Sequence, residues 1–339
     1  MKLSKSFIGL ATVSTIFVIY ASGFYTNFQS DSALEIIDFS IAKPASEQNI
    51  PPNPDRIPLY GDLHVHTKYS FDAYIFGVTA TPYDAYKYAI GEAIKHPLGF
   101  DMKLKEPLDF YAVTDHGFYM GMIENYADTS SKMSKNEWTK PMHNLNRPEN
   151  VTVESLGARA DLFSSVLTQA IIKPYPYWHP KVWKAWFTNN IQVALQSFDY
   201  DVHKSAWADV ANAAEEFNDP GKFTTFIGYE FTTSTDVEGG NLHRNVIFNS
   251  SDAPIRPWTR IDSINPEDLW TWMDGLRDQG VDSLAMPHNS NGSNGQMFEV
   301  ETFTGNAINN EYSEKRMRNE PVVEITQIKG TSDTHPLLS

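Results

Sequence analysis

The chain has 339 residues, a formal net charge of −15 and no cysteine. This length is enough for a barrel-sized core with additions, and 41% apolar residues are typical of a globular rather than a disordered chain. The negative charge argues against nucleic acid as a partner, because polyanions are repelled at long range and no run of basic residues would form a binding stripe. The lack of cysteine excludes disulfides, cysteine nucleophiles and thiolate metal sites, so any metal ion must be held by His, Asp, Glu and water.

The N-terminus has the features of a targeting signal. Lys2 and Lys5 precede an uncharged apolar stretch at residues 7–25, with small residues for cleavage at 21–23. The same stretch is about long enough to span a membrane. Residues 1–25 are therefore interpreted as a signal peptide or a membrane anchor, and both predict an exported, periplasmic or otherwise extracytoplasmic protein.

The rest of the chain alternates between strand-like and helix-like segments. Residues 26–57 are polar and rich in proline near their end, which is typical of a linker. Thr81 and Asn265 each precede a proline and predict the starts of two helices. Apolar runs that end in polar residues predict strands at 59–66, 110–114, 223–230, 243–248 and 283–286. Strands that deliver polar residues at their carboxyl ends and are joined by helices indicate parallel βα units, and hence an α/β fold.

Residues 118–222 differ from this pattern. They are rich in Trp and Tyr, and the segments 154–172, 181–198 and 202–218 have helical periodicity. We interpret them as a helical insertion between the strands. Such aromatic density is more typical of packing than of a ligand cage.

Several predicted strand ends carry side chains that can bind metal. His64 and His66 lie two residues apart, so both point to the same side of a strand. His116 follows the next strand in the motif Thr-Asp-His-Gly, and Glu230 and His288 follow later ones. Each motif alone is compatible with an ordinary polar residue at a loop. Together they place nitrogen and oxygen ligands at the end of the strands where parallel barrels build their sites.

The segments GDLHVHTKYSFDA and LDFYAVTDHG resemble the PHP superfamily, named for the polymerase-associated domain and histidinol phosphatase. The finer match, which includes VVEITQIKGTSDTHPLLS, resembles the domain-of-unknown-function family 3604 over residues 58–339. The resemblance implies a distorted (β/α)7 barrel, here with a helical insertion, and two or three divalent ions, usually zinc, manganese or iron. The metal ligands it implies are His64, His66, Asp72, His116, Glu230, His243 and His288.

The resembled family usually ends with an Asp-x-His pair of ligands from the last strand. Asp333-Thr334-His335 has this spelling. In that family, however, the stretch KGTSDTH precedes the true pair, which is then expected beyond Ser339. We therefore expect a domain that is incomplete at its C-terminus, with Asp333 and His335 outside the site; the alternative is that these two residues are the final ligands.

Other polar residues are candidates for supporting roles. Asp62 and Asp115 are expected to hold metal ligands in place, although Asp115 is equally suited to bonding the backbone. Lys68 and Arg244 are candidate contacts for a phosphate. Strand alternation would point Arg244 away from the pocket, and a surface ion pair is the simpler role for either residue.

The implied function is a metal-dependent hydrolase without a protein nucleophile. Metal ions bring the pKa of bound water down toward ~7, which provides a metal-bound hydroxide at neutral pH. A small anionic substrate, in particular a phosphoester, fits because metal ions neutralise charge on phosphoryl oxygens. The alternatives are hydrolysis of a non-phosphate substrate, since a fold does not fix chemistry, and an inactive barrel that binds metal or a ligand. The sequence indicates neither the substrate nor the oligomeric state.

The targeting interpretation predicts the effect of charge in the apolar stretch. Replacing Ile16 and Val18 by Asp should prevent export, because two carboxylates disrupt the uncharged run that a secretory signal requires. Cell fractionation followed by immunoblotting should then find the variant in the cytoplasm. An unchanged distribution would show that residues 7–25 do not direct export.

Overall fold

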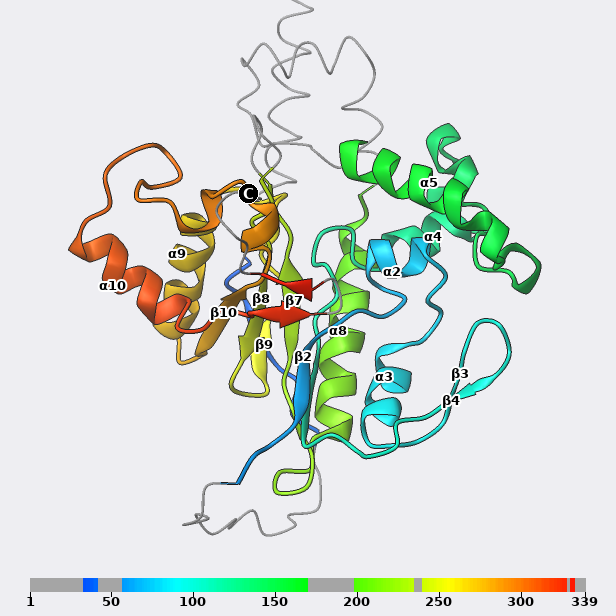
Figure 1. Ribbon diagram of the computed structural model, residues 1–339, viewed down its shortest axis with the longest axis horizontal. Helices are drawn as coiled ribbons and strands as arrows, with labels where there is room; N and C mark the ends of the chain where they lie inside the picture. Colours follow the sequence, from blue (N-terminus) through cyan, green and yellow to red (C-terminus); the bar gives the residue numbers. More distant parts are fainter. Residues whose placement is uncertain (1–32, 42–56, 170–197, 235–239, 328–329, 333–339) are drawn as a thin grey trace, which may run out of the picture.

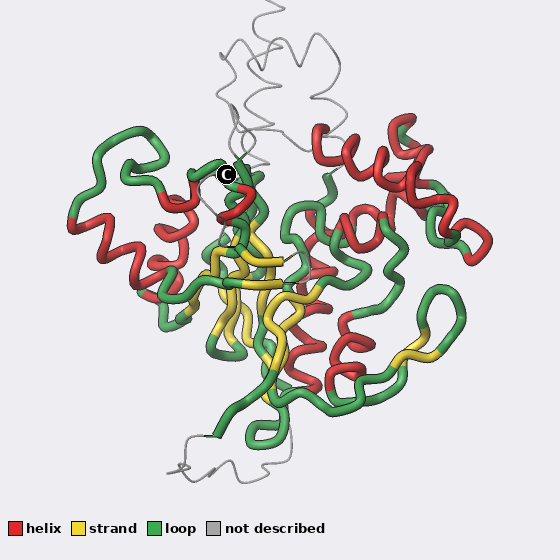
Figure 2. Tube along the Cα trace, viewed as in Figure 1, coloured by secondary structure: helices red, strands yellow, loops and turns green. Residues whose placement is uncertain are grey.

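The computed structural model describes residues 33–41, 57–169, 198–234, 240–327 and 330–332. These residues form a mixed α/β structure, with strands in the middle and helices on two sides (Figure 1). The same view coloured by secondary structure shows that long loops connect many of the elements (Figure 2). The described strands do not close into the barrel that the sequence resemblance implies. Two three-stranded sheets form the centre instead.

The first central sheet is parallel, as the βα pattern predicts. Its strands lie in the order β2 (Gly61–Val65), β5 (Phe110–Val113) and β6 (Thr224–Thr225). A Cβ atom on Gly61 would lie 2.3 Å from the carbonyl oxygen of Phe110, so this position at the start of β2 requires glycine. The register between β2 and β5 shifts between Asp62 and Val65, next to the histidine motif.

The second central sheet is antiparallel, which corrects the expectation of parallel units throughout. Its strands lie in the order β10 (Ser283–Pro287), β8 (Arg244–Phe248) and β7 (Gly228–Phe231). The described part of the connection from β7 to β8 contains no helix. Parallel neighbours need a long crossover, usually a helix, whereas a short connection favours antiparallel pairing.

The two sheets meet just beyond the end of β5. His116 forms an isolated parallel bridge with Glu230. The Gly117 amide donates to the Glu230 carbonyl at 2.9 Å, and the Glu230 amide donates to the Asp115 carbonyl at 2.9 Å. This pairing extends β5 alongside β7 and places two predicted metal ligands next to each other.

The helices agree with the predicted starts more closely than with the predicted ends. Thr81 forms a capping box with Asp84, and the Asn265 side chain accepts from the Glu267 amide, so both predicted N-caps are present. The helix after Asn265 ends at Arg277. The helices are α2 (Phe71–Ile75), α3 (Pro82–Ala89), α4 (Met122–Ala127), α5 (Leu156–Gln169), α8 (Tyr200–Phe217), α9 (Pro266–Arg277) and α10 (Asn310–Asn319).

Three small two-stranded sheets complete the fold. β3 (Ile94–Lys95) pairs with β4 (Asp101–Met102), and β11 (Thr326–Gln327) pairs with β12 (Gly330–Thr331). The third sheet corrects the linker prediction, because residues 36–38 are not free. They form β1 (Ile36–Asp38), which pairs with β9 (Asp252–Pro254). The nearby Ala33 carbonyl accepts from the Trp272 indole at 2.7 Å, which ties this segment to α9.

The two parts of the expected insertion pack into two different apolar clusters. Trp207 on α8 is fully buried in the main core with Tyr229 and Phe248, so α8 covers the central strands. The segment before it packs into a second cluster around Phe71 and Phe118. Both observations agree with a packing role for the aromatic residues of this region. The predicted helix at 181–198 lies largely outside the described residues, and so does the 1–25 segment. No helix in the described ranges is long and apolar enough to cross a membrane.

A buried ion pair joins β8 to the helices beside it. The Arg244 guanidinium lies 2.6 Å from the Glu320 carboxylate, and both side chains are almost completely buried. Glu320 also accepts from the Trp270 indole at 2.9 Å and pairs with Arg316 at 3.2 Å. One carboxylate thus links a central strand to α9 and α10.

Arg244→Met should destabilise the protein by about 3 kcal/mol, because it leaves the Glu320 carboxylate buried with one cation fewer. Urea unfolding of the purified protein measures the change. Adding Glu320→Gln should recover more than ~1 kcal/mol, since the uncompensated charge is then removed while an acceptor for Trp270 is kept. Arg318→Met, which breaks a more exposed pair with Asp274, should cost less than ~1 kcal/mol. Equal effects of the two arginine variants would contradict the assignment.

Candidate functional site

The predicted metal ligands come from segments that lie far apart in the sequence, and the structure brings them together. They are His64 on β2, His66 after β2, Asp72 on α2, His116 after β5, Glu230 on β7, His243 before β8 and His288 after β10.

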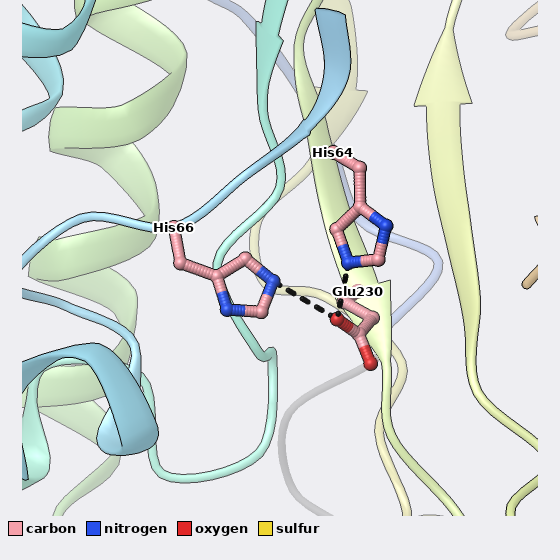
Figure 3. Close-up of side chains that lie close together, drawn as sticks. All are labelled: His64, His66 and Glu230. Atoms are coloured by element: carbon pink, nitrogen blue, oxygen red, sulfur yellow. Dashed lines mark hydrogen bonds and ion pairs between the residues drawn. The ribbon is translucent and has the colours of Figure 1, made fainter. Parts of the chain in front are cut away.

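Glu230 occupies the centre of this cluster. Its Oε2 atom lies 3.0 Å from His66 Nε2 and 3.4 Å from His64 Nε2, so the two histidines of the first motif face one carboxylate oxygen (Figure 3). The other oxygen, Oε1, is surrounded by three further imidazoles. It lies 3.1 Å from His116 Nδ1, 2.6 Å from His243 Nδ1 and 3.4 Å from His288 Nε2.

Asp72 forms the next carboxylate along the cluster. Its carboxylate lies 3.2 Å from His66 Nδ1 and 3.5 Å from His116 Nε2. Ser70 donates to the other oxygen of Asp72 at 2.6 Å, which holds this carboxylate at the start of α2.

Glu324 is a member of the cluster that the sequence analysis missed. Its Oε2 atom lies 2.8 Å from His64 Nδ1 and 3.9 Å from His288 Nδ1. It lies in the segment VVEITQI at 322–328, where no histidine or recognised motif marks it. The available signal is an acidic residue after two valines in a segment rich in β-branched residues.

The charges within the cluster shift its pKa values in opposite directions. Burial alone would raise the pKa of Glu230, but electrostatic interactions with His116, His288 and His243 hold it well below the usual range. Burial would lower the pKa of His64, but the hydrogen bonds to Glu230 and Glu324 raise it to about 9. Burial prevails at His243, whose pKa falls to about 4. Neighbouring histidines of the cluster therefore differ in the direction of their pKa shift.

Several ligand sets overlap in this cluster. In each set the donor atoms lie within 4.8 Å of one another. The sets are His64, His66 and Glu230; His116, Glu230 and His243; His66, Asp72 and His116; and His64, His288 and Glu324. Imidazole and carboxylate are the ligand types that zinc, manganese and iron accept.

His288 shows that hydrogen bonding within the protein does not satisfy the whole cluster. Its side chain is 1% exposed, and neither ring nitrogen has a hydrogen-bond partner among the described residues. An unsatisfied buried polar group costs about 1–3 kcal/mol. A cation bound beside His288 would supply the missing partner.

The two supporting aspartates bond to the backbone around the ligands. Asp62 accepts from the His64 amide at 2.9 Å. Asp115 is fully buried and accepts from the Thr67 amide at 2.5 Å and from its hydroxyl at 2.6 Å. Burial raises the pKa of Asp115 to about 6 even though these hydrogen bonds lower it. Neither carboxylate bonds to an imidazole; both fix the turns that carry His64, His66 and His116.

The two basic residues proposed as phosphate contacts have other partners. Lys68 pairs with Glu124 at 2.9 Å. Arg244 pairs with Glu320, as described above, and also contacts the Leu242 carbonyl and Met297. Strand alternation explains this, because His243 faces the cluster and the next residue along the strand points elsewhere.

A comparison with known protein families assigns most of the chain, and not only the site, to one family. The model of the family described as protein of unknown function, DUF3604, matches residues 53–339. The chain belongs to the DUF3604 family. The searches of curated proteins and of solved structures gave no match.

The DUF3604 assignment confirms the finer of the two sequence resemblances. Asp333 and His335, for which the same resemblance left two alternatives, lie outside the described residues. The nearest described segment, β11 and β12, lies against the end of β10: Gln327 and Ser332 both donate to the His288 carbonyl, at 3.1 and 2.8 Å.

A buried histidine outside the cluster holds the turn after His116. His203 on α8 donates from Nε2 to the Gly117 carbonyl at 2.7 Å. Gly117 packs closely here, since a Cβ atom would lie 2.8 Å from the Tyr229 ring. The glycine is thus needed for close packing, whereas the dihedral angles show no left-handed turn at this position. Burial lowers the pKa of His203 to about 4.

Acid should lower the folding stability of this DUF3604 protein through protonation of His203. Its folded-state pKa lies below the unfolded value of 6.5, so the folded state binds fewer protons between these values. The stability from neutral His203 is complete above pH 6.5 and is lost as the pH falls toward 4, with a total of about 3 kcal/mol. Urea unfolding across this range should show a shallower pH dependence for His203→Gln, which still offers a donor to Gly117. His96→Gln, on the turn between β3 and β4, is the control. Parallel curves for wild type and His203→Gln would refute the assignment.

Proposed function

We propose that this DUF3604 protein is an exported, metal-dependent hydrolase of the PHP type that acts on phosphoesters. In this proposal the parallel strands β2 and β5 are part of a distorted PHP-type (β/α)7 barrel. Two of the histidine motifs lie at or just after the carboxyl ends of these strands, the end at which such barrels carry their sites.

The central observation is that one buried carboxylate has five imidazoles around it. Glu230 is 1% exposed. Its Oε2 atom faces two imidazoles and its Oε1 atom faces the other three. Burying a single carboxylate does not require five histidines. Each oxygen of Glu230 faces a separate histidine set, and each set together with this carboxylate could hold a cation.

The residues present fit such cations. His64, His66 and Glu230 would hold one ion, and His116, His243 and Glu230 a neighbouring one. Asp72 with His66 and His116 offers a third position. A bound divalent cation would supply Lewis acidity toward the substrate and would activate water. The protein's own part is to hold the donors: Asp62 and Asp115 fix the two turns, and Glu230 keeps its charge because the imidazoles surround it.

The substrate class follows from charge. A phosphoester brings negative charge into a protein with a net charge of −15, which bound cations can offset locally. Lys68 and Arg244 are paired with Glu124 and Glu320, so neither brings an unpaired positive charge to a phosphate. This pairing favours, as the second candidate, the same metal-dependent hydrolysis acting on a non-phosphate substrate.

Removing two donors tests the proposal. His64→Ala combined with His66→Ala should lower the metal content by at least one ion per chain and reduce hydrolysis by more than ~100-fold, since even indirect partners of metal ligands cost about 10–100-fold. Metal content is measured by elemental mass spectrometry and activity on a panel of phosphoesters and carboxylic esters. Removal of metal by a chelator should abolish the activity of the wild type, and added metal should restore it.

The matched control removes two histidines outside the cluster, His96 and His143. This variant should keep its metal and its activity. Full metal content and activity in the His64/His66 variant would overturn the proposal. Metal binding without hydrolysis in the wild type would identify a binding protein, and hydrolysis confined to carboxylic esters would favour the second candidate.

A further inference from the structure

Glu324 lies at the edge of the cluster, next to the end of β10. Its backbone amide donates to the Pro287 carbonyl at 3.0 Å, one residue before His288. After it, Ser332 returns and donates to the Ile325 carbonyl at 2.6 Å. The backbone around Glu324 is therefore fixed, and its side chain, 15% exposed, reaches toward His64.

The two ring nitrogens of His64 have different neighbours. Nδ1 lies 2.8 Å from Glu324 Oε2, within hydrogen-bond distance. Nε2 lies 3.4 Å from Glu230 Oε2, on the side where His66 Nε2 also points (Figure 3). An ionised carboxylate only accepts hydrogen bonds. A proton on Nδ1 therefore satisfies Glu324 and leaves the lone pair of a neutral imidazole on Nε2, facing Glu230.

We propose that Glu324 is the positioning residue of His64: it holds the Nδ1–H tautomer and the ring orientation that make Nε2 the metal-binding atom. This rests on the proposed function. A carboxylate behind a histidine ligand fixes the ring and raises the basicity of the ligating nitrogen. His66 has a comparable arrangement, with Nδ1 facing Asp72 and Nε2 facing Glu230.

A direct ligand role for Glu324 is the competing assignment. It would place an ion between Glu324, His64 and His288. The distances favour positioning, because Oε2 is at hydrogen-bond distance from His64 but 3.9 Å from His288.

The experiment measures Zn²⁺ binding by the metal-stripped, purified chain in competition with a chromophoric chelator. Glu324→Ala should weaken binding of one Zn²⁺ by about 10–100-fold without changing the number of ions bound at saturation. Glu324→Gln keeps an oxygen that accepts from Nδ1–H, so its loss should be clearly smaller. Glu301→Ala, an exposed glutamate away from the cluster, should bind as the wild type does.

A second measurement gives the tautomer directly. Nitrogen-15 NMR of histidine-labelled, Zn²⁺-loaded protein, with His64→Ala used to assign the signal, should show His64 protonated at Nδ1 in the wild type. The tautomer is read from the wild type, so this result does not depend on whether the Glu324 variants fold. His64 protonated at Nε2 would overturn the inference, and so would wild-type affinity in Glu324→Ala.

The outcomes also separate this inference from the function on which it rests. Equal losses in Glu324→Gln and Glu324→Ala, with one ion fewer at saturation and the same result for His288→Ala, would make Glu324 a direct ligand. Metal binding by the wild type that no Glu324 variant weakens would remove the inference alone. A wild type that binds no metal would remove the proposed function, and this inference with it.

Discussion

The Glu230 carboxylate is the group on which the architecture of the site depends. A buried, ionised carboxylate costs several kcal/mol unless positive or hydrogen-bonding groups surround it. Here the compensating groups come from β2, from the turn after β5, and from the ends of β8 and β10. The strands that carry these groups must therefore converge before Glu230 can be buried. The backbone bridge between His116 and Glu230 contributes to this convergence, because it joins the parallel sheet to the antiparallel one at this position.

The residues around the cluster hold its histidine side chains and the turns that carry them in fixed positions. Asp115 holds Thr67, and His203 reaches from α8 to hold Gly117, so the two turns that carry histidines are each fixed from outside. Thr232 bonds to the His116 ring on the side that faces Glu230. A site of closely spaced donors gains from such restriction, because each ring is held in place before any ligand arrives and less ordering is needed on binding.

The sequence predicted the site better than the sheet. His64, His66 and His116 could be found because short motifs place them at strand ends, and parallel strands present their ends together. The antiparallel half of the centre could not be deduced, since β7, β8 and β10 have the same apolar patterns as parallel strands. The pairing of Arg244 with Glu320 depends on a helix far along the chain, and local alternation could show only that Arg244 turns away. Glu324 was missed for the same reason: its partner His64 is 260 residues distant, and nothing local distinguishes it. The segment 36–38 was assigned to a linker because a strand of three residues has too few positions for any periodicity.

The charge of the cluster can be balanced in two ways, and this connects its stability to what it binds. Five imidazoles surround three carboxylates: Asp72, Glu230 and Glu324. The pKa values of His64, His66 and His116 are raised by neighbouring carboxylates, whereas burial lowers those of His243 and His288. A divalent cation can bind only to imidazole nitrogens that have lost their protons, so it replaces protons rather than adding to them. Protons and a bound cation would therefore compete for the same imidazole nitrogens.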